Sequence, residues 1–378
     1  MMKEQGSTTV ELPASMRPSA WPAYVGVVLV TAGLLLPLLS LSGAKKKSPP
    51  KSQANHLSNP KPTLRKLAVP GHTHHDCPPS GKFHRWDGWR RSLRLAMEPL
   101  PVSLERLKPL HCHKGKPGPH DWLAHMDESG QSLRAYREAG IVKPTPLRTT
   151  IVIQPLGSFT PIQHLLLLRL SEYMKAYFCL PVRLQKPQVP QLPKRARRTN
   201  VLGEQYLTSY LAQNVLRPQL PSDAVAFLGF TAKDLWPGES WNFVYGAAYR
   251  TLRTGVWSLR RLGGDADAKT LSRRVLRRVL KVATHEAGHL FSMPHCIAYE
   301  CNMNGCNHLQ EMESTPMALC PVCLGKLMYN TGCNPIQRFS RLQALMTKWG
   351  LTEEARFFAQ SKERMKVKVE SKKSMTQK

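Results

Sequence analysis

Acidic residues are scarce in this chain of 378 residues, which has 25 Asp and Glu against 54 Lys and Arg and a formal net charge of +29. Such a balance can mark a protein that binds nucleic acid or an anionic membrane. No recognition-helix, zinc-finger or RNA-recognition pattern accompanies the basic residues, which are spread over several regions of the chain. The sequence therefore argues against a nucleic-acid partner and favours a basic surface attracted to acidic lipid heads.

The number of cysteines is odd, so they cannot all pair with one another within the chain. Nine cysteines in a large chain give weak support to a disulfide scaffold. Cys77, Cys112 and Cys179 lie apart from the other six, and we expect them to be isolated thiols.

Charge is absent from residues 23–42, which are long enough to cross a bilayer core as a helix. Lysines follow at 45–47. If the apolar segment is retained, the preference of positively charged flanks for the cytosolic side places the C-terminal part of the chain in the cytosol. Small residues at 42–44 also fit a signal peptide that is cleaved in the secretory pathway, and a buried globular helix is a third interpretation. We expect a single-pass membrane protein that is anchored through residues 23–42.

The most informative stretch of the chain is HEAGHLFSMPH at residues 285–295. His285 and His289 are four apart, so on a helix both imidazoles can reach one Zn²⁺ ion at ~2.0–2.1 Å. His295 closes a three-nitrogen site if the helix stops and the chain turns back near Pro294. Glu286 is placed to act as a general base. The alternative is a buried helix whose histidines bind carbonyl groups.

Four cysteines follow in two close pairs, namely Cys296, Cys301, Cys320 and Cys323. This arrangement is typical of a four-cysteine zinc site with metal–sulfur distances of ~2.3 Å. Two disulfides, or a redox-active CPVC sequence, are the alternatives. Cys306 and Cys333 lie close enough in sequence to confuse the ligand assignment.

The run HEAGHLFSMPHC, the CNM sequence at 301–303 and CPVC at 320–323 resemble the archaemetzincin (archaelysin) family of zinc metallopeptidases, and its second animal type more than its first. The upstream stretches IVIQPLGSF, LGFTAKDLWPG and SWNFVYGAA are similar to this family too, so the resemblance extends over about residues 121–350. It implies a metzincin-like fold of the α/β (α+β) class, with a mixed sheet, an active-site helix and a structural four-cysteine zinc site.

Carried onto this chain, the resemblance assigns the catalytic zinc to His285, His289 and His295, the acid/base role to Glu286 and the Met-turn to Met303. The four cysteines then hold a structural zinc, which makes two zinc ions per chain. The implied activity is hydrolysis of peptide bonds in a peptide or protein substrate, with aminopeptidase-like cleavage and endopeptidase action as the alternatives. The lysines at 45–47, not the resemblance, place this domain in the cytosol.

One residue departs from the family pattern, because the motif reads HExxHxxSxxH with Ser292 in place of glycine. Glycine is favoured where a helix ends in a left-handed conformation. Serine there raises the alternative of a catalytically weak or inactive zinc-binding interaction module. The intact Glu286 argues against it, because a purely structural site gains nothing from this carboxylate.

The chain is expected to divide into a polar N-terminus (1–22), the apolar segment (23–42), a basic proline-rich linker and irregular region (43–120), the metallopeptidase domain (121–360) and a disordered charged tail (361–378). Apolar patterns predict strands at 149–154, 180–184, 224–230, 241–249 and 255–258. They predict helices at 162–178, 206–216, 271–291 and 336–360, and a loop around the basic residues 194–198.

Overall fold

The computed structural model describes residues 88–239, 241–263 and 271–366. Within these ranges the larger sheet has five strands in the order β2-β1-β5-β8-β7. The strands are β1 (Thr150–Leu156), β2 (Val182–Leu184), β5 (Ala224–Thr231), β7 (Gly246–Tyr249) and β8 (Thr254–Ser258). Four of them run parallel, and β7 pairs antiparallel with β8 at one edge. The predicted mixed sheet is therefore confirmed.

The central strands β1 and β5 are buried along their whole length. Such continuous apolar runs are typical of parallel strands that are covered on both faces. Side chains alternate between the faces, so Ile151 and Ile153 belong to the main core while Val152 and Leu156 belong to a second, smaller core.

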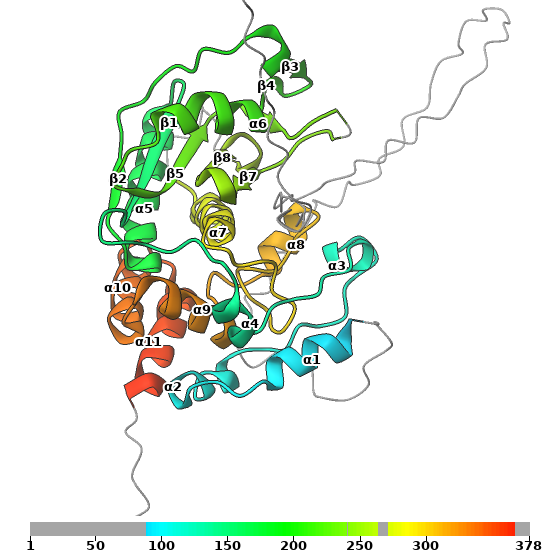
Figure 1. Cartoon of the computed structure of the whole chain (residues 1–378), viewed down its shortest axis with the longest axis vertical. Helices are drawn as coiled ribbons and strands as arrows, with labels where there is room; N and C mark the ends of the chain where they lie inside the picture. Colours follow the sequence, from blue (N-terminus) through cyan, green and yellow to red (C-terminus); the bar gives the residue numbers. More distant parts are fainter. Residues whose placement is uncertain (1–87, 240, 264–270, 367–378) are drawn as a thin grey trace, which may run out of the picture.

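Two helices of 18 residues, α5 (Pro161–Phe178) and α7 (Arg273–Leu290), share the main core with the side chains on one face of the sheet. The π-helix η4 (Leu211–Leu216) contributes to the smaller core. α5 begins at a capping box in which Thr160 and Gln163 satisfy each other's backbone N–H groups. Figure 1 shows α7 between the sheet and the C-terminal helices, so its buried face lies at the centre of the molecule.

Residues 309–366 of the described C-terminal part form four helices, α8 (Leu309–Ser314), α9 (Pro321–Thr331), α10 (Pro335–Lys348) and α11 (Thr352–Lys366). The sequence predicted one helix over 336–360, but α10 and α11 are separated at Gly350, which has a φ of 70°. α11 also continues beyond residue 361, where the disordered tail was expected to begin, because Ser361 and Met365 are buried.

Residues 88–148 form short helices, α1 (Trp89–Met97), α2 (Val102–Glu105), the 3-10 helix η2 (Lys108–Leu110), α3 (Trp122–His125) and α4 (Leu133–Glu138). The sequence placed residues up to 120 in an irregular region. In the structure Leu104 and Leu107 belong to the main core, and the Tyr299 hydroxyl donates a hydrogen bond to the Ala96 carbonyl. Packed structure is thus present well before residue 121.

A second sheet of three strands was not predicted, namely β3 (Arg197–Asn200), β4 (Gly203–Leu207) and β6 (Asp234–Trp236). It includes part of the stretch expected to be a basic loop. The helix predicted from residue 206 begins at α6 (Thr208–Tyr210), because residues 206 and 207 belong to β4. Side-chain pairs stabilise this sheet, with Arg198 bonded to Gln205 and stacked on the Trp236 ring. The remaining 3-10 turns are η3 (Lys194–Ala196), η5 (Arg217–Gln219), η6 (Arg250–Leu252) and η7 (Arg260–Leu262).

The prediction that Cys179 is an isolated thiol is wrong, because Cys179 forms a disulfide with Cys333. This bond joins the C-terminal end of α5 to the chain that follows α9, across 154 residues of sequence. Cys112 is disulfide-bonded as well. Cys77 lies outside the described residues.

The predicted localisation, a single-pass membrane protein, also requires correction. No helix in the ranges that the structure describes is both long enough and apolar enough to cross a bilayer. The longest helices, α5 and α7, carry several charged side chains and pack in the core. Residues 23–42, on which the prediction was based, lie outside the described residues.

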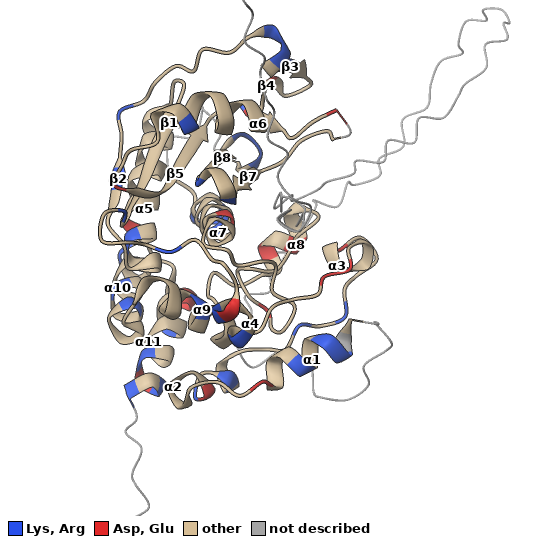
Figure 2. Ribbon diagram, in the orientation of Figure 1, with Lys and Arg blue, Asp and Glu red and all other residues tan. Residues whose placement is uncertain are grey.

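Lys and Arg are distributed from α1 and α2 to β3 rather than gathered on one element (Figure 2). Several of those on α7 are paired, since Arg274 and Arg278 contact the Glu313 carboxylate and Arg277 contacts Glu354. The basic face of this helix is therefore partly neutralised by the C-terminal helices.

Candidate metal centre

The last turns of α7 bring His285 and His289 together on one buried face. Their Nε2 atoms are 3.0 Å apart. The chain then reverses, and the His295 ring lies 5.3 Å from the His285 ring and 4.9 Å from the His289 ring, between centroids. One ring nitrogen of each histidine lies within 4.8 Å of the others, so the structure brings together the three imidazoles that the sequence predicted.

A Schellman turn produces this reversal. The Met293 N–H donates to the Gly288 carbonyl and the Ser292 N–H to the His289 carbonyl. Ser292 has a φ of 66°, so it holds the left-handed position that glycine holds in the family pattern. Its hydroxyl accepts a hydrogen bond of 3.0 Å from the Val142 N–H. Serine therefore makes the turn and also ties it to the segment after α4.

The hydrogen bonds of the first two histidines define their tautomers. Nδ1 of His285 lies 2.7 Å from the Asn302 carbonyl, and Nδ1 of His289 lies 2.7 Å from the Met293 carbonyl. A carbonyl only accepts, so each Nδ1 carries the proton and each neutral imidazole presents a bare lone pair at Nε2. Two lone pairs 3.0 Å apart repel each other unless a cation lies between them.

Burial supports the same protonation state, because it lowers the pKa of His285 to about 3, with the neighbouring His295 adding to the effect. Burial also lowers the pKa of His289 well below its ordinary value. Both rings are therefore neutral at physiological pH, which is the state in which imidazole binds a metal. The donor set fits zinc, for which tetrahedral geometry with ~2.0–2.1 Å bonds requires nitrogens about 3.3 Å apart.

Glu286 is fully buried, and neither of its carboxylate oxygens has a hydrogen-bond partner among the described residues. Burial raises its pKa well above the ordinary value. An unsatisfied buried carboxylate is unfavourable for stability, and such groups are usually explained by a functional role or an unseen partner. The partner of Glu286 is thus expected to come from outside the described residues.

Met303 is completely buried, in the turn whose Asn302 carbonyl orients His285. Gly288 makes this approach possible, since a β-carbon at residue 288 would lie 2.5 Å from the Met303 sulfur. The Met303 carbonyl in turn accepts a hydrogen bond from the Cys296 N–H. The same turn therefore links the histidine cluster to the cysteine cluster.

The four predicted cysteines also come together, with all four sulfurs within 4.8 Å of one another and all four side chains buried. The sulfurs of Cys296 and Cys320 are 3.7 Å apart, close to the ~3.8 Å edge of a tetrahedral thiolate site with ~2.3 Å bonds. Cys320 is the N-cap of α9 and Cys323 lies in its first turn. Cys306 is a separate buried thiol.

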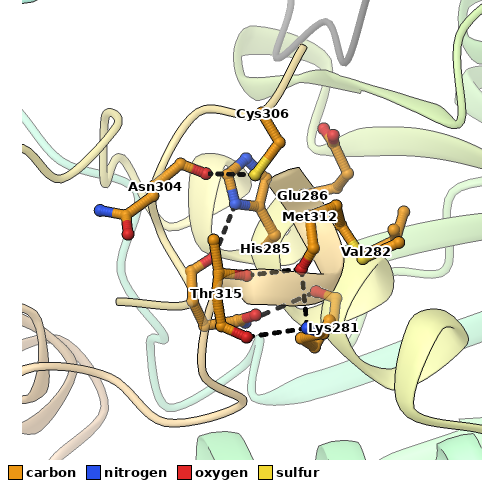
Figure 3. A pocket seen from close by; sticks show the side chains of 9 residues that line it. Lys281, Val282, His285, Glu286, Asn304, Cys306, Met312 and Thr315 are labelled. Atoms are coloured by element: carbon orange, nitrogen blue, oxygen red, sulfur yellow. Dashed lines mark hydrogen bonds between the residues drawn. The ribbon is translucent and has the colours of Figure 1, made fainter. Parts of the chain in front are cut away.

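A small cavity of about 10 Å³, with room for about one water molecule, lies beside His285. Its lining residues are Lys281, Val282, His285, Glu286, Asn302, Asn304, Cys306, Met312 and Thr315. Figure 3 shows Cys306 and His285 toward one end and Lys281 at the other, with the Glu286 carboxylate directed away from Lys281. The Lys281 ammonium donates to three backbone carbonyls, those of Met312, Glu313 and Thr315, so its hydrogen-bonding capacity is satisfied.

Two residues near the site were missed in the sequence. A Glu128 carboxylate oxygen lies 2.7 Å from Nδ1 of His295, and the Trp122 indole N–H donates to the same oxygen at 2.8 Å. Glu128 is 167 residues from His295 in sequence. No local pattern marks it, so only the tertiary fold could reveal the contact.

Comparison with known proteins supports the similarity noted in the motifs. Residues 221–329 match Peptidase family M54. Archaemetzincin-2 of Homo sapiens is 30% identical over 282 residues, which are 66% of this chain and 77% of that protein. Archaemetzincin-1 of Homo sapiens is 28% identical over 270 residues, 61% and 53% of the two chains.

Among solved structures, archaemetzincin from Methanopyrus kandleri is 28% identical, with a TM-score of 0.40 over 50% of this chain and 97% of that chain. Of the two relatives, archaemetzincin-2 is the more similar, in both identity and the share of each chain that is covered. The chain therefore belongs to the archaemetzincin family of zinc metallopeptidases, peptidase family M54.

Proposed function

We propose that this protein is a zinc-dependent metalloprotease that hydrolyses peptide bonds at the site formed by His285, His289 and His295. One observation carries the proposal. Two neutral imidazoles direct bare lone pairs at each other across 3.0 Å, and a buried carboxylate without a partner follows the first of them in the sequence. A site of this kind is completed by a cation and a water.

The three histidines would hold zinc through their Nε2 atoms, leaving one coordination position open. Bound there, zinc would supply a Lewis acid that polarises the scissile carbonyl and acidifies water. A Glu286 carboxylate oxygen accepts the proton of the attacking water and then delivers it to the leaving amine nitrogen. Because neither Glu286 oxygen is bonded to another described residue, both are available to hold this proton between the two steps.

The cavity beside Glu286 has room for about one water molecule, so a side chain of the substrate would lie outside it. Its cation, Lys281, is already bonded to three carbonyls. The substrate class that the peptidase family implies is a peptide or a protein.

Aminopeptidase-like cleavage is the finer proposal that follows from the family. It requires a group that receives the substrate's terminal ammonium, and the residues lining the cavity offer no carboxylate for this role besides Glu286, which the mechanism uses as the base. Hydrolysis of a peptide with a free amino terminus, compared with its N-acetylated form, tests this mode. Faster cleavage of the free form supports an aminopeptidase, and equal rates contradict it.

We also propose that Cys296, Cys301, Cys320 and Cys323 hold a structural zinc. Four buried sulfurs that all lie within 4.8 Å of one another can satisfy this ion without an open position. The ion would connect the turn after His295 to the start of α9 and thereby support the position of His295 and Met303.

The alternative, a catalytically weak or inactive zinc-binding module, was motivated by Ser292. That motive is weakened by the turn itself, in which Ser292 takes the left-handed conformation and His295 reaches the other two rings. The retention of Glu286 in the motif is a further argument for catalysis.

The decisive variant is Glu286→Gln, which keeps the size of the side chain and removes its ability to accept a proton. Hydrolysis of a fluorogenic peptide should fall by roughly 10²- to 10⁴-fold while the zinc content stays that of the wild type. Glu313→Gln is the matched control, because Glu313 contacts α7 through Arg274 and Arg278 away from the histidines. Unchanged hydrolysis by the zinc-loaded Glu286→Gln variant would overturn the proposal.

A further inference from the structure

We propose that Glu128 is a positioning residue for the metal centre, a carboxylate that fixes the orientation and tautomer of His295 and strengthens it as a ligand. This inference rests on the proposed function, since it concerns the third histidine of that site. It assigns a role at the centre to a residue outside the matched stretch 221–329.

The contact itself is short and shielded from water. A Glu128 oxygen lies 2.7 Å from Nδ1 of His295, and the exposed fractions of the two side chains are 10% and 5%. Since the acceptor is a carboxylate, Nδ1 of His295 carries the proton and Nε2 presents its lone pair to the other two imidazoles. All three rings therefore present the same bare nitrogen.

The three histidines differ in what orients them. His285 and His289 donate to backbone carbonyls, which are neutral, whereas His295 donates to a carboxylate. A charged acceptor gives a stronger hydrogen bond and makes the imidazole more basic. Glu128 also brings a negative charge close to a centre whose three ligands are neutral.

Glu128 is itself held in place by several contacts. The Trp122 indole N–H donates to its carboxylate at 2.8 Å, and Arg91 donates to its backbone carbonyl at 2.8 Å. Trp122 lies edge-on to the His295 ring, with centroids 5.0 Å apart. Gly305 provides the space for this indole, because a β-carbon at residue 305 would overlap it.

Further support comes from Glu311, whose carboxylate accepts the backbone N–H of Trp122 at 3.0 Å. Trp122 is thus held at both its backbone nitrogen and its ring nitrogen. The segment around α3 is consequently built against the metal centre, and it reaches His295 from a part of the chain that carries none of the predicted ligands.

The test compares Glu128→Gln with the wild type as full-length protein. Zinc affinity of the histidine site is measured by competition with a chromophoric chelator, and stoichiometry by elemental analysis. Glu128→Gln retains a hydrogen-bond acceptor but loses the charge, so we expect zinc to bind roughly 10- to 100-fold more weakly at this site. The four-cysteine site should keep its zinc.

Two further variants separate positioning from general stability. Glu128→Asp keeps the charge on a shorter stem and should recover part of the affinity. Glu313→Gln removes a partly buried carboxylate that contacts α7 elsewhere, and it should bind zinc as the wild type does. An affinity loss that is equal in Glu128→Gln and Glu313→Gln would show a structural effect and overturn the inference.

Cobalt substitution gives a readout that does not depend on activity. The visible spectrum of Co²⁺ at the histidine site should differ between the wild type and Glu128→Gln, because the ligand strength of His295 changes. If Glu128→Gln bound zinc as tightly as the wild type and gave the same cobalt spectrum, the role of Glu128 would be contradicted, but the proposed function would not. Failure of the proposed function has a different signature, since His289→Ala would then lose no zinc.

Discussion

Ser292 holds the left-handed position of the Schellman turn that carries His295 back to α7. A β-carbon in this conformation is unfavourable by roughly 1–2 kcal/mol. Two contacts on this turn offset the strain, namely the bond from the Val142 N–H to the Ser292 hydroxyl and the bond from the Tyr136 hydroxyl to the Phe291 carbonyl. The departure from the family glycine is thus accommodated by the surrounding side chains.

Ser292→Ala keeps the β-carbon and removes the acceptor of the Val142 N–H. We expect the free energy of unfolding to fall by about 1 kcal/mol, whereas Ser292→Gly should change it by less because the strain is relieved as well. Urea unfolding of the three proteins measures the difference. Equal stability of the wild type and Ser292→Ala would show that the hydroxyl contributes nothing.

At the scale of elements, the position of Glu286 depends on how α7 meets the edge strand β7. Gly246 in β7 lies against this side chain, and a β-carbon there would come within 3.2 Å of Glu286 Cγ and 2.8 Å of a Trp257 ring carbon. Glycine at this point therefore lets the strand, the helix and the indole of Trp257 pack closely.

Gly246→Ala should displace β7 or the Glu286 side chain while the three histidines remain in place. Peptide hydrolysis is expected to fall on the order of 10- to 100-fold with the zinc content unchanged, because a small misplacement of a catalytic group is enough for such a loss. Ala247→Gly, one residue along the same strand, controls for a general weakening of β7. Full activity of Gly246→Ala would contradict the packing argument.

The elements that could be predicted are those with a local signal. The apolar runs of β1 and β5, the periodicity of α5 and the spacing of the motif on α7 all placed elements close to their observed bounds. The β3–β4 hairpin was missed because its strands are polar and depend on partners such as Asp234 of β6, which bonds Asn200. Glu128 and the bond between Cys179 and Cys333 were missed because their partners lie more than 150 residues away.

In the whole molecule, separate parts of the chain converge on the metal centre. The N-terminal segment supplies Glu128, α7 and its turn supply the histidines, and the following turn supplies Met303. Several titratable groups are buried as a consequence, and the stability of the metal-free protein therefore depends on pH.

Lowering the pH from 6.5 toward 5 should destabilise the metal-free protein. The pKa of His285 is lowered from 6.5 to about 3, so in this window the unfolded chain binds a proton that the folded protein excludes. His289 acts in the same direction. The stabilisation from these two neutral histidines is thus complete above pH 6.5 and is lost as the pH falls, before carboxylates such as Glu313, with a pKa lowered to about 2 mainly by Arg274, begin to contribute. Glu286, whose pKa is raised by burial, acts in the opposite direction, but it is one group against two.

Thermal unfolding in the presence of a chelator at pH 8, 6.5 and 5 checks this expectation. The His289→Ala variant should lose less stability over the same range, because one buried imidazole is gone. An unfolding temperature of the wild type that does not change between pH 6.5 and 5 would contradict the assigned protonation states.

The claim on which the account depends is that three imidazoles hold a metal that is separate from the one held by four thiolates. The zinc content per chain of the purified full-length protein tests it most directly, measured for the wild type and for His289→Ala. We predict two zinc ions in the wild type and one in the variant. A His289→Ala variant that retains as much zinc as the wild type would contradict the account.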